Sequence, residues 1–300
     1  MTRIRSTSTS RVRDVRGQGG GGGFSIPGLG GGGGGLGFPM KAGGGLLGLI
    51  VLAAAIFLPR LLGGGSQPVS APSVAGANGS ESLGPTQCET EIEQVICGGT
   101  DDVAVYWIGE FPQAFNGRQY EETFTQIFSG AINTACGQAT SQVGPFYCPA
   151  DHLVYFDLEF LQQLQQQFGA TGDLAAQYIV AHEYGHHVQN LLGISDQVNR
   201  ASQQDPSRAN QYSIALELQA DCFAGAWAHD AEQRGQLDPG EISEALNAAA
   251  AVGDDRIQQQ TQGQVNPETW THGSSEQRVS WFRRGFETGD PNSCDTFGEL

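Results

Sequence analysis

The stretch His182-Glu183-Tyr184-Gly185-His186 decides how this sequence is interpreted. In a helix, residues four positions apart lie on one face, so the two imidazoles can reach the same metal ion. Neutral imidazole is the usual zinc ligand, and zinc lowers the pKa of its bound water to about 7. Glu183 lies beside the imidazoles and can deprotonate that water. The stretch therefore predicts a zinc site rather than two surface histidines on a helix, and His187, about 500° round the helix from His182, should be structural.

A pair of carboxylates, Glu217 and Asp221, follows about thirty residues later. They are again four apart, in a predicted helix over residues 212–234 that is otherwise largely apolar. Carboxylates in a mostly buried helix need a cation, which disfavours the alternative of a solvated acidic face. Catalytic zinc takes three protein ligands plus water, and two His with one Glu is a known set. We expect Glu217 to complete the ligands His182 and His186, and Asp221 to fix the tautomer of a ligating histidine.

The two motifs together resemble those of the gluzincin metallopeptidases, in particular the branch of CAAX prenyl protease-like peptidases. The resemblance is closer still to the bacterial family described as "putative neutral zinc metallopeptidases". It is carried by residues 144–151, 154–158, 182–187, 217–227 and 271–278. These segments spread over roughly residues 85–297. The resemblance implies a zincin-like peptidase domain with Zn²⁺ as its cofactor and a peptide or protein as its substrate.

The resemblance also implies roles for residues outside the two motifs. It places His272 in the cleft, where an imidazole could stabilise the oxyanion of a tetrahedral intermediate; the alternative is a helix-capping or surface histidine. It also implies that a strand over residues 153–157 borders the cleft and pairs with an extended substrate. Tyr147, Tyr155 and Asp157 are then candidate cleft residues, although aromatic residues in a strand more often belong to a core.

The remaining pattern predicts a mostly helical α+β domain with a small sheet and one core. The apolar run at residues 103–108 indicates a strand or a buried segment, and residues 119–128 indicate a helix. Residues 153–157 are typical of a short strand. Asp173 should cap the zinc-binding helix, and Gly193 should end it.

The first 84 residues differ in composition from the rest. Residues 1–44 are rich in Arg, Ser and Gly and predict a disordered tail. Residues 45–62 contain an apolar run that, counted from Ala42, approaches the roughly 20 residues needed to span a bilayer. The run starts too far from the N-terminus for a signal peptide, which favours an uncleaved transmembrane helix. Residues 63–84 predict a flexible linker to a peptidase domain at residues 85–300.

The distribution of charge predicts the orientation of this anchor. Six basic residues precede the apolar run: Arg3, Arg5, Arg11, Arg13, Arg16 and Lys41. Between Arg60 and Arg118 there are none, so the positive-inside rule places the N-terminus in the cytoplasm and the domain outside, as a single-pass protein of the cell membrane. Residues 61–300 carry 31 of the 32 acidic and 8 of the 15 basic residues. Such an acidic surface repels nucleic acid, so we expect no nucleic-acid partner.

All six cysteines lie on the predicted outer side of the membrane, where an even number favours disulfides. They are Cys88, Cys97, Cys136, Cys148, Cys222 and Cys294. Proximity in sequence favours pairing the first two and the next two, which leaves Cys222 with Cys294. Six cysteines permit 15 pairings, so this assignment stays open. A cysteine metal cluster is disfavoured because no C-x-x-C spacing occurs.

These observations predict a membrane-anchored zinc endopeptidase. Glu183 would take a proton from the attacking water and pass it to the leaving amine. One alternative is a non-catalytic binding module in which zinc is a structural staple. Structural zinc sites have four protein ligands, whereas this one offers three and retains Glu183, which disfavours that alternative. Another is a zinc amidase that acts on cell-wall peptides, whose chemistry at the amide is the same.

Overall fold

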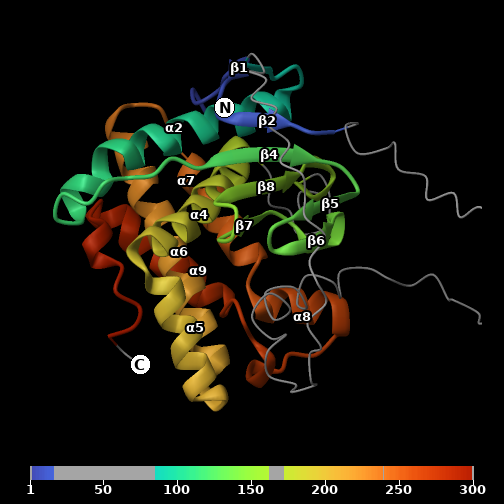
Figure 1. The fold of residues 1–300 in the computed structure, drawn as a ribbon, viewed down its shortest axis with the longest axis vertical. Helices are drawn as coiled ribbons and strands as arrows, with labels where there is room; N and C mark the ends of the chain where they lie inside the picture. The colour runs from blue at the N-terminus through green and yellow to red at the C-terminus, as the bar shows by residue number, and fades with distance from the viewer. Residues whose placement is uncertain (1, 17–84, 162–171, 239, 299–300) are drawn as a thin grey trace, which may run out of the picture.

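The computed structural model describes residues 2–16, 85–161, 172–238 and 240–298 of the 300-residue chain. Helices make up most of the domain, and a small sheet lies beside them at the upper right of Figure 1. The prediction of a mostly helical α+β domain is confirmed. The described helices are α2 (Glu91–Ala114), α4 (Asp173–Leu192), α5 (Ile194–Gln204), α6 (Ala209–Gln233), α7 (Glu241–Ala251), α8 (Asp254–Gln262) and α9 (Ser275–Thr288), with 3₁₀ turns η1 (Ser141–Val143), η2 (Pro206–Arg208), η3 (Pro267–Thr269) and η4 (Pro291–Ser293).

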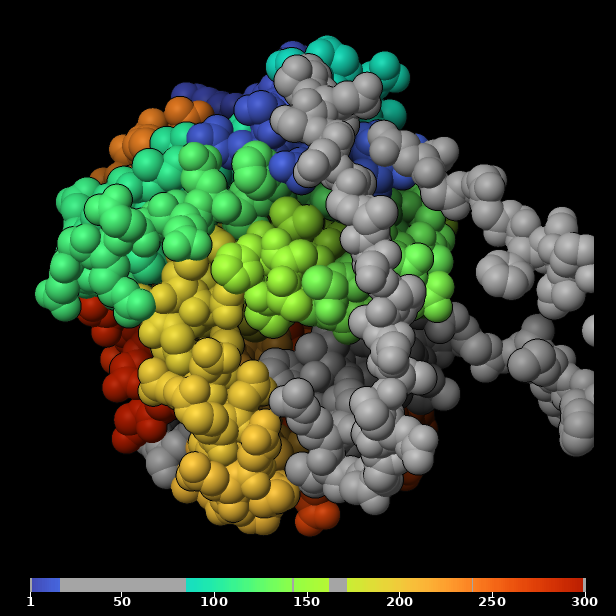
Figure 2. All heavy atoms as spheres, in the orientation of Figure 1, coloured from blue at the N-terminus to red at the C-terminus, as the bar shows by residue number. Residues whose placement is uncertain are grey.

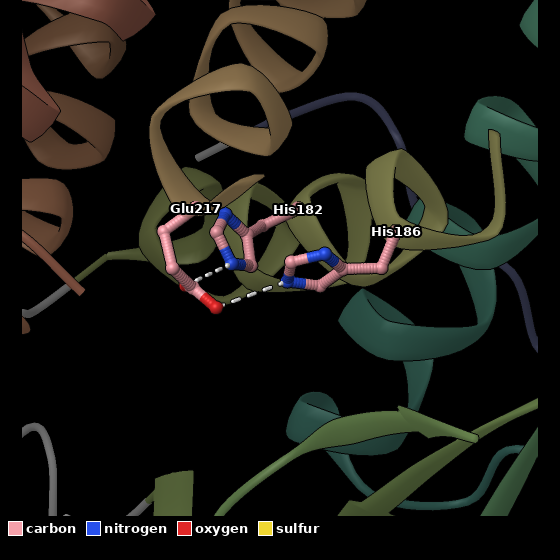
Figure 3. A group of neighbouring side chains, drawn as sticks. All are labelled: His182, His186 and Glu217. Carbon is pink, nitrogen blue, oxygen red and sulfur yellow. Dashed lines mark hydrogen bonds and ion pairs between the residues drawn. The ribbon is translucent and has the colours of Figure 1, made fainter. Parts of the chain in front are cut away.

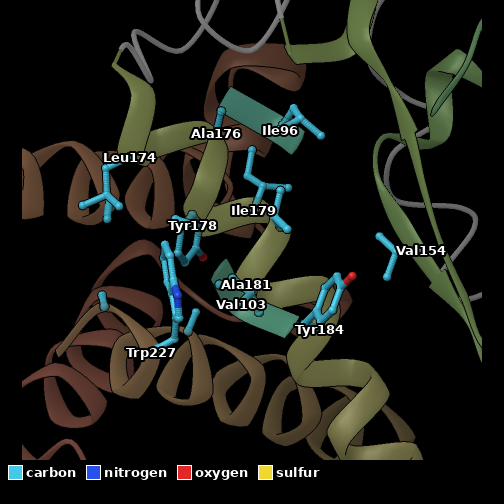
Figure 4. Close-up of a cluster of buried hydrophobic side chains, with 14 of the residues drawn as sticks. Ile96, Val103, Val154, Leu174, Ala176, Tyr178, Ile179, Ala181, Tyr184 and Trp227 are labelled. Atoms are coloured by element: carbon cyan, nitrogen blue, oxygen red, sulfur yellow. The ribbon is translucent and has the colours of Figure 1, made fainter. Parts of the chain in front are cut away.

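Helix α4 is the centre of the domain and packs against α2, α6 and α7. It is buried on nearly every side, since 15 of its 20 residues are buried. A helix that is enclosed all round has little freedom to shift, so it is a rigid support for any side chain it carries. Figure 4 shows Tyr178, Ile179 and Ala181 of α4 within this core, together with Trp227 of α6 and Val154 on the sheet side.

Among the described residues, four strands form the main sheet, in the order β2-β4-β8-β7. β2 is parallel to β4 and β4 to β8, whereas β7 is antiparallel to β8. β8 is therefore an inner strand, and β7 ends the sheet on the side that contacts α4. The described strands are β1 (Ser8–Thr9), β2 (Val12–Asp14), β3 (Thr86–Gln87), β4 (Phe124–Phe128), β5 (Ala131–Thr134), β6 (Gly137–Thr140), β7 (Phe146–Cys148) and β8 (Leu153–Asp157); β1 pairs with β3 and β5 with β6.

Three local predictions need correction. The helix predicted over residues 119–128 is wrong, because residues 124–128 form β4, in which Thr125, Ile127 and Phe128 are buried and Phe124 and Gln126 are half-buried. Of the two alternatives for the apolar run at residues 103–108, the strand is wrong and the buried segment is confirmed: the run lies in α2, with Val103, Ala104, Tyr106 and Trp107 buried. Asp173 does not cap α4: Gly172 occupies the cap position without a side-chain hydrogen bond, and Asp173 instead pairs with Arg5. The strand at residues 153–157 is confirmed.

The N-terminal residues are part of the folded domain. The expectation of a disordered tail is wrong for residues 2–16, which supply β1 and β2 and bury Ile4 and Val12 to 5% and 1% exposure. Figure 2 shows these residues in blue, packed along the top of the domain. The rest of the predicted tail, the anchor at 45–62 and the linker at 63–84 lie outside the described residues. Within the described ranges, no helix combines the length and apolarity needed to cross a membrane.

The disulfide pairing expected from sequence proximity is confirmed in full. Cys88 pairs with Cys97, Cys136 with Cys148, and Cys222 with Cys294. The last bridge joins the middle of α6 to the segment after α9. It therefore fixes the C-terminal segment to the helix that carries Glu217 and Asp221.

Candidate metal centre

Helices α4 and α6 bring the three predicted zinc ligands together (Figure 3). His182 and His186 extend from the same face of α4, and Glu217 approaches them from α6. His182 Nε2 lies 3.2 Å from Glu217 Oε2, and His186 Nε2 lies 3.5 Å from Glu217 Oε1. One donor atom from each residue lies within 4.8 Å of the others, which is close enough for a single ion to contact all three.

Hydrogen bonds on the far side of each imidazole orient the two rings. His182 Nδ1 lies 2.9 Å from Asp221 Oδ1, as predicted for a residue that fixes its tautomer. His186 Nδ1 lies 2.9 Å from the amide oxygen of Gln189. Because both Nδ1 atoms are engaged, both Nε2 atoms face Glu217. Two imidazole nitrogens and one carboxylate, with space for a fourth ligand, fit catalytic zinc.

A buried cluster around Asp221 supports this arrangement. Arg278 of α9 donates from Nε to Asp221 Oδ2 at 2.8 Å and from a terminal nitrogen to Oδ1 at 2.9 Å. The hydroxyl of Tyr178 donates to the same carboxylate. Burial alone would raise the pKa of Asp221, but Arg278 and His182 lower it, so the carboxylate stays ionised. Burial alone would lower the pKa of His182, but the carboxylates of Asp221 and Glu217 raise it to about 9. The two carboxylates therefore favour a positive charge at the position of this imidazole.

A cavity of about 440 Å³ opens beside the three ligands. Glu183 lies in its wall, and burial raises the pKa of this carboxyl above its ordinary value. Other parts of the wall are apolar. They include Phe146, Phe160, Ile179, Leu216, Val252 and Ile257.

The strand that borders the cavity is β7, not the predicted β8. Phe146 and Tyr147 of β7 line the cavity, whereas no residue of β8 does among the described lining residues. Tyr155 donates its hydroxyl to Asp151, and Asp157 is fully buried and accepts backbone hydrogen bonds from Gly130 and Glu159. Of the three candidate cleft residues Tyr147, Tyr155 and Asp157, only Tyr147 reaches the cavity.

His272 lies in the cavity wall, as the resemblance implied. Ser274, not His272, caps α9, so the capping alternative is wrong. Asp254 of α8 fixes the position of His272: its Oδ2 accepts the backbone N–H of Thr271, His272 and Gly273, and its Oδ1 lies 3.1 Å from His272 Nδ1. Burial alone would lower the pKa of His272, but the hydrogen bond to Asp254 raises it above its usual value.

His187 points away from the metal ligands, in agreement with the prediction from helix geometry. Its Nε2 lies 2.6 Å from the carbonyl of Glu121 and its Nδ1 lies 3.0 Å from the hydroxyl of Tyr147. The ring is fully buried, and burial lowers its pKa to about 4, so it is neutral at physiological pH. His187 is thus a structural link between α4 and the segment before the sheet.

Sequence reasoning missed three residues that hold the site: Gln189, Asp254 and Arg278. None belongs to a metal-binding pattern. Asp254 and Arg278 reach the site from α8 and α9, whereas Gln189 lies on α4 itself, one turn after His186, the position from which a side chain can meet that ring. Arg278 is also the last residue of the segment 271–278 that carries the family resemblance.

Comparisons with known proteins agree with this geometry. Residues 2–297 match the family described as "Putative neutral zinc metallopeptidase", a match that includes the N-terminal strands. The chain is 44% identical over 297 residues to the uncharacterized protein YpfJ of Escherichia coli (strain K12), covering 97% of this chain and 96% of that protein. It is 54% identical over 189 residues to an uncharacterized protein of Mycobacterium tuberculosis (strain ATCC 25618 / H37Rv), covering 59% of this chain and 63% of that protein.

No solved structure matches the chain significantly. The family match covers nearly the whole chain, and it implies the same cofactor as the donor set of His182, His186 and Glu217. The chain therefore belongs to the family described as putative neutral zinc metallopeptidases, and its cofactor is Zn²⁺.

Proposed function

We propose that the domain is a zinc-dependent endopeptidase that hydrolyses extended peptide segments. The observation that carries this proposal is the convergence of His182, His186 and Glu217 beside a cavity whose wall contains Glu183. A structural zinc would be enclosed by four protein ligands, whereas this set has three and faces an open cavity. The arrangement therefore favours catalysis over a structural staple.

Zinc bound at this site would act as a Lewis acid and lower the pKa of a water molecule, so that this water can lose a proton and attack the substrate at neutral pH. Glu183 takes the proton from the attacking water, because its carboxylate lies in the cavity wall and its pKa is raised by burial. The same carboxyl then gives the proton to the departing amine. His272, oriented by Asp254, donates a hydrogen bond to the oxyanion that develops on the substrate carbonyl.

The cavity and strand β7 support extended peptides as the substrate class. β7 is the last strand of the main sheet, and Phe146 and Tyr147 place it directly at the cavity. An extended peptide can add to the edge of a sheet through its backbone, and its side chains then enter neighbouring pockets. The apolar wall supports a preference for a large apolar side chain next to the cleaved bond.

The Glu183→Gln variant tests the mechanism. It should keep the fold and the zinc but lose about 10²–10⁴-fold in turnover, because an amide cannot accept the proton. His186→Ala is the contrasting variant: it should lose zinc as well as activity. Undiminished turnover of Glu183→Gln on a peptide library would refute the mechanism. Wild-type protein that binds zinc but cleaves no peptide would favour a binding module, and cleavage restricted to cell-wall peptides would favour an amidase.

We also propose that the domain works outside the cytoplasm and is associated with the membrane. Three disulfides support the first part, because disulfides persist in oxidising compartments. The apolar run at residues 46–62 supports the second, through sequence alone, since it lies outside the described residues. Fractionation of cells that express the full chain, with and without a carbonate wash, tests the association.

A further inference from the structure

The N-terminal residues bind the acidic domain through their arginines. Five of the six basic residues that precede the apolar run make contacts with the folded domain. Arg3 pairs with Asp238, Arg5 with Asp173, Arg11 with Asp101 and Glu122, and Arg16 with Glu93, and Arg13 lies 4.6 Å over the ring of Phe124. The arginines whose charge predicted a cytoplasmic N-terminus therefore form ion pairs and a cation–π contact with the acidic domain.

The same residues also complete the main sheet. β2 pairs in parallel with β4, with Val12 opposite Thr125 and Arg13 opposite Gln126. Arg11 accepts a hydrogen bond from the backbone N–H of Thr125 at 2.9 Å, and Val15 donates to Ile127 at 2.9 Å. Val12 is only 1% exposed. Backbone pairing and apolar burial add to the surface ion pairs, which would contribute little alone.

The segment before β1 reaches the first turns of the zinc-binding helix. The side-chain amide of Gln177, on α4, donates to the carbonyl of Ile4 at 2.6 Å. Arg5 pairs at 2.7 Å with Asp173, the first residue of α4. Gly98 of α2 makes this contact sterically feasible, because a Cβ there would come within 2.5–2.7 Å of the backbone of Ile4 and Arg5.

We propose that residues 2–16 lie in the same compartment as the peptidase domain and hold the start of α4 in place. A chain that crossed a membrane an odd number of times between residues 17 and 84 would separate β2 from β4, and the sheet could not form. The single-pass orientation expected from the charges, with the N-terminus inside and the domain outside, is incompatible with this pairing. The shared compartment rests on the strand pairing and the support of α4 on the contacts of Ile4 and Arg5, and neither depends on the peptidase activity.

Disulfide trapping in intact membranes tests the shared compartment. Arg13 and Gln126 are opposite each other in neighbouring strands, so Arg13→Cys/Gln126→Cys in the full chain should form a bridge when intact membranes are treated with a mild oxidant. The control is Arg13→Cys/Val265→Cys, since Val265 is exposed and follows α8 at the opposite end of the domain (Figure 1). Peptide mapping under non-reducing conditions should find the bridge in the first variant only.

An epitope tag at the N-terminus gives an independent readout. In spheroplasts, a membrane-impermeant protease or label should reach the tag and the domain from the same side. A protected tag beside an accessible domain, or failure of the residue 13–126 bridge in protein that retains its three native disulfides, would overturn the proposal. If the chain proves not to associate with the membrane, bridge formation still decides whether the N-terminal strand pairs with the domain.

Two glycines of α2 test whether the segment holds α4. Gly98→Ala should displace residues 4–5, whereas Gly109→Ala is the matched control, because nothing lies within 4 Å of a Cβ at that position. We expect faster hydrogen exchange in residues 4–14 and 173–177 for Gly98→Ala and wild-type exchange for Gly109→Ala. If Gly98→Ala fails to fold, Arg5→Gln gives the milder test and should speed exchange at residues 173–177. Wild-type protection of residues 173–177 in Gly98→Ala and Arg5→Gln would refute the holding role.

Discussion

At the scale of single residues, the two imidazoles of the metal site have different supports. His182 is oriented by a carboxylate, Asp221, whereas His186 is oriented by the neutral amide of Gln189. Gln189 also donates 2.7 Å to the carbonyl of Leu216 and 3.1 Å to Gln219, so it holds His186 against the turn of α6 that precedes Glu217. One amide therefore joins the two helices that supply the zinc ligands.

Replacement of Gln189 should weaken zinc binding without removing a ligand. Gln189→Leu is expected to lower zinc affinity by about 10–100-fold, the usual effect of losing a group that orients a ligand. Gln189→Glu keeps an acceptor for His186 Nδ1 and should retain more affinity than Gln189→Leu. Competition with a chromogenic chelator measures the zinc affinity of both variants. The control is Gln203→Leu, at an exposed position of α5. Equal affinities of Gln189→Leu and wild type would contradict the role of this amide.

The buried His187 should make the domain sensitive to acid. Its pKa is lowered to about 4 in the folded state from 6.5 in the unfolded chain. Between these values the unfolded state binds a proton that the folded state does not, so stability falls as pH decreases from about 6.5 to about 4. The loss from this residue can reach about 3 kcal/mol. Urea unfolding of metal-free wild type and His187→Gln across this range should show a shallower fall for the variant; parallel curves would contradict the assignment.

The sequence is sufficient to predict the site residues that lie close together along the chain on one helix. His182, Glu183 and His186 share one helix, and Glu217 and Asp221 share another, so the spacing alone predicts which of them can face a common point. Arg278 and Asp254 could not be predicted in this way. They reach Asp221 and His272 from other helices, and only the packing of α8 and α9 brings them there.

At the scale of elements, the bridge between Cys222 and Cys294 links the C-terminal segment to the zinc-binding helix. Gln219 of α6 donates to the carbonyl of Cys294 at 2.9 Å and accepts from Gln189. A continuous set of hydrogen bonds thus runs from the disulfide to His186. Loss of the bridge should therefore affect the metal as well as the fold.

The double variant Cys222→Ala/Cys294→Ala should be less stable and bind zinc more weakly. The bridge closes a loop with a sequence separation of 72, which corresponds to about 4 kcal/mol in the chain-entropy account. Cys136→Ala/Cys148→Ala is the control, since that bridge lies in the β region and the described hydrogen bonds of its two cysteines go to Thr134 and His152 rather than to a zinc ligand. It should lower the melting temperature but leave zinc affinity unchanged. A similar loss of zinc affinity in the two variants would show that the Cys222–Cys294 bridge has no specific connection to the metal.

The sequence predicts a helix correctly where one hydrophobic periodicity dominates. It predicts less well where contacts with other elements determine the secondary structure. The helices that carry the ligands and the end of α4 at Gly193 follow from local signals. The apolar residues of 119–128 fit one face of a helix and so predict a helix, yet pairing of β4 with both β2 and β8 outweighs that preference. The sequence alone also does not reveal the close contact of α6 and α9. This contact requires a glycine at position 285, because a Cβ there would come within 1.9 Å of the carbonyl oxygen of Cys222.

At the scale of the whole molecule, distant parts of the chain meet at the centre. The site combines ligands from α4 and α6 with Arg278 of α9, and residues 2–16 brace the start of α4. Composition placed residues 2–16 in a disordered tail because they are polar and short of apolar side chains. Their order comes from strand pairing and from arginines that meet an acidic domain, and neither is visible in the segment taken alone.

Removal of zinc should destabilise the domain as a whole, because the ion would join the two central helices α4 and α6. A ligand that binds only the folded state at 1,000 times its dissociation constant contributes about 4 kcal/mol. For a domain of this size we expect a chelator to lower the melting temperature by roughly 10 °C. Glu183→Gln should respond as the wild type does, since it keeps all three ligands. His186→Ala should melt low with or without chelator, so a chelator response of wild-type size in that variant would place the zinc elsewhere in the molecule.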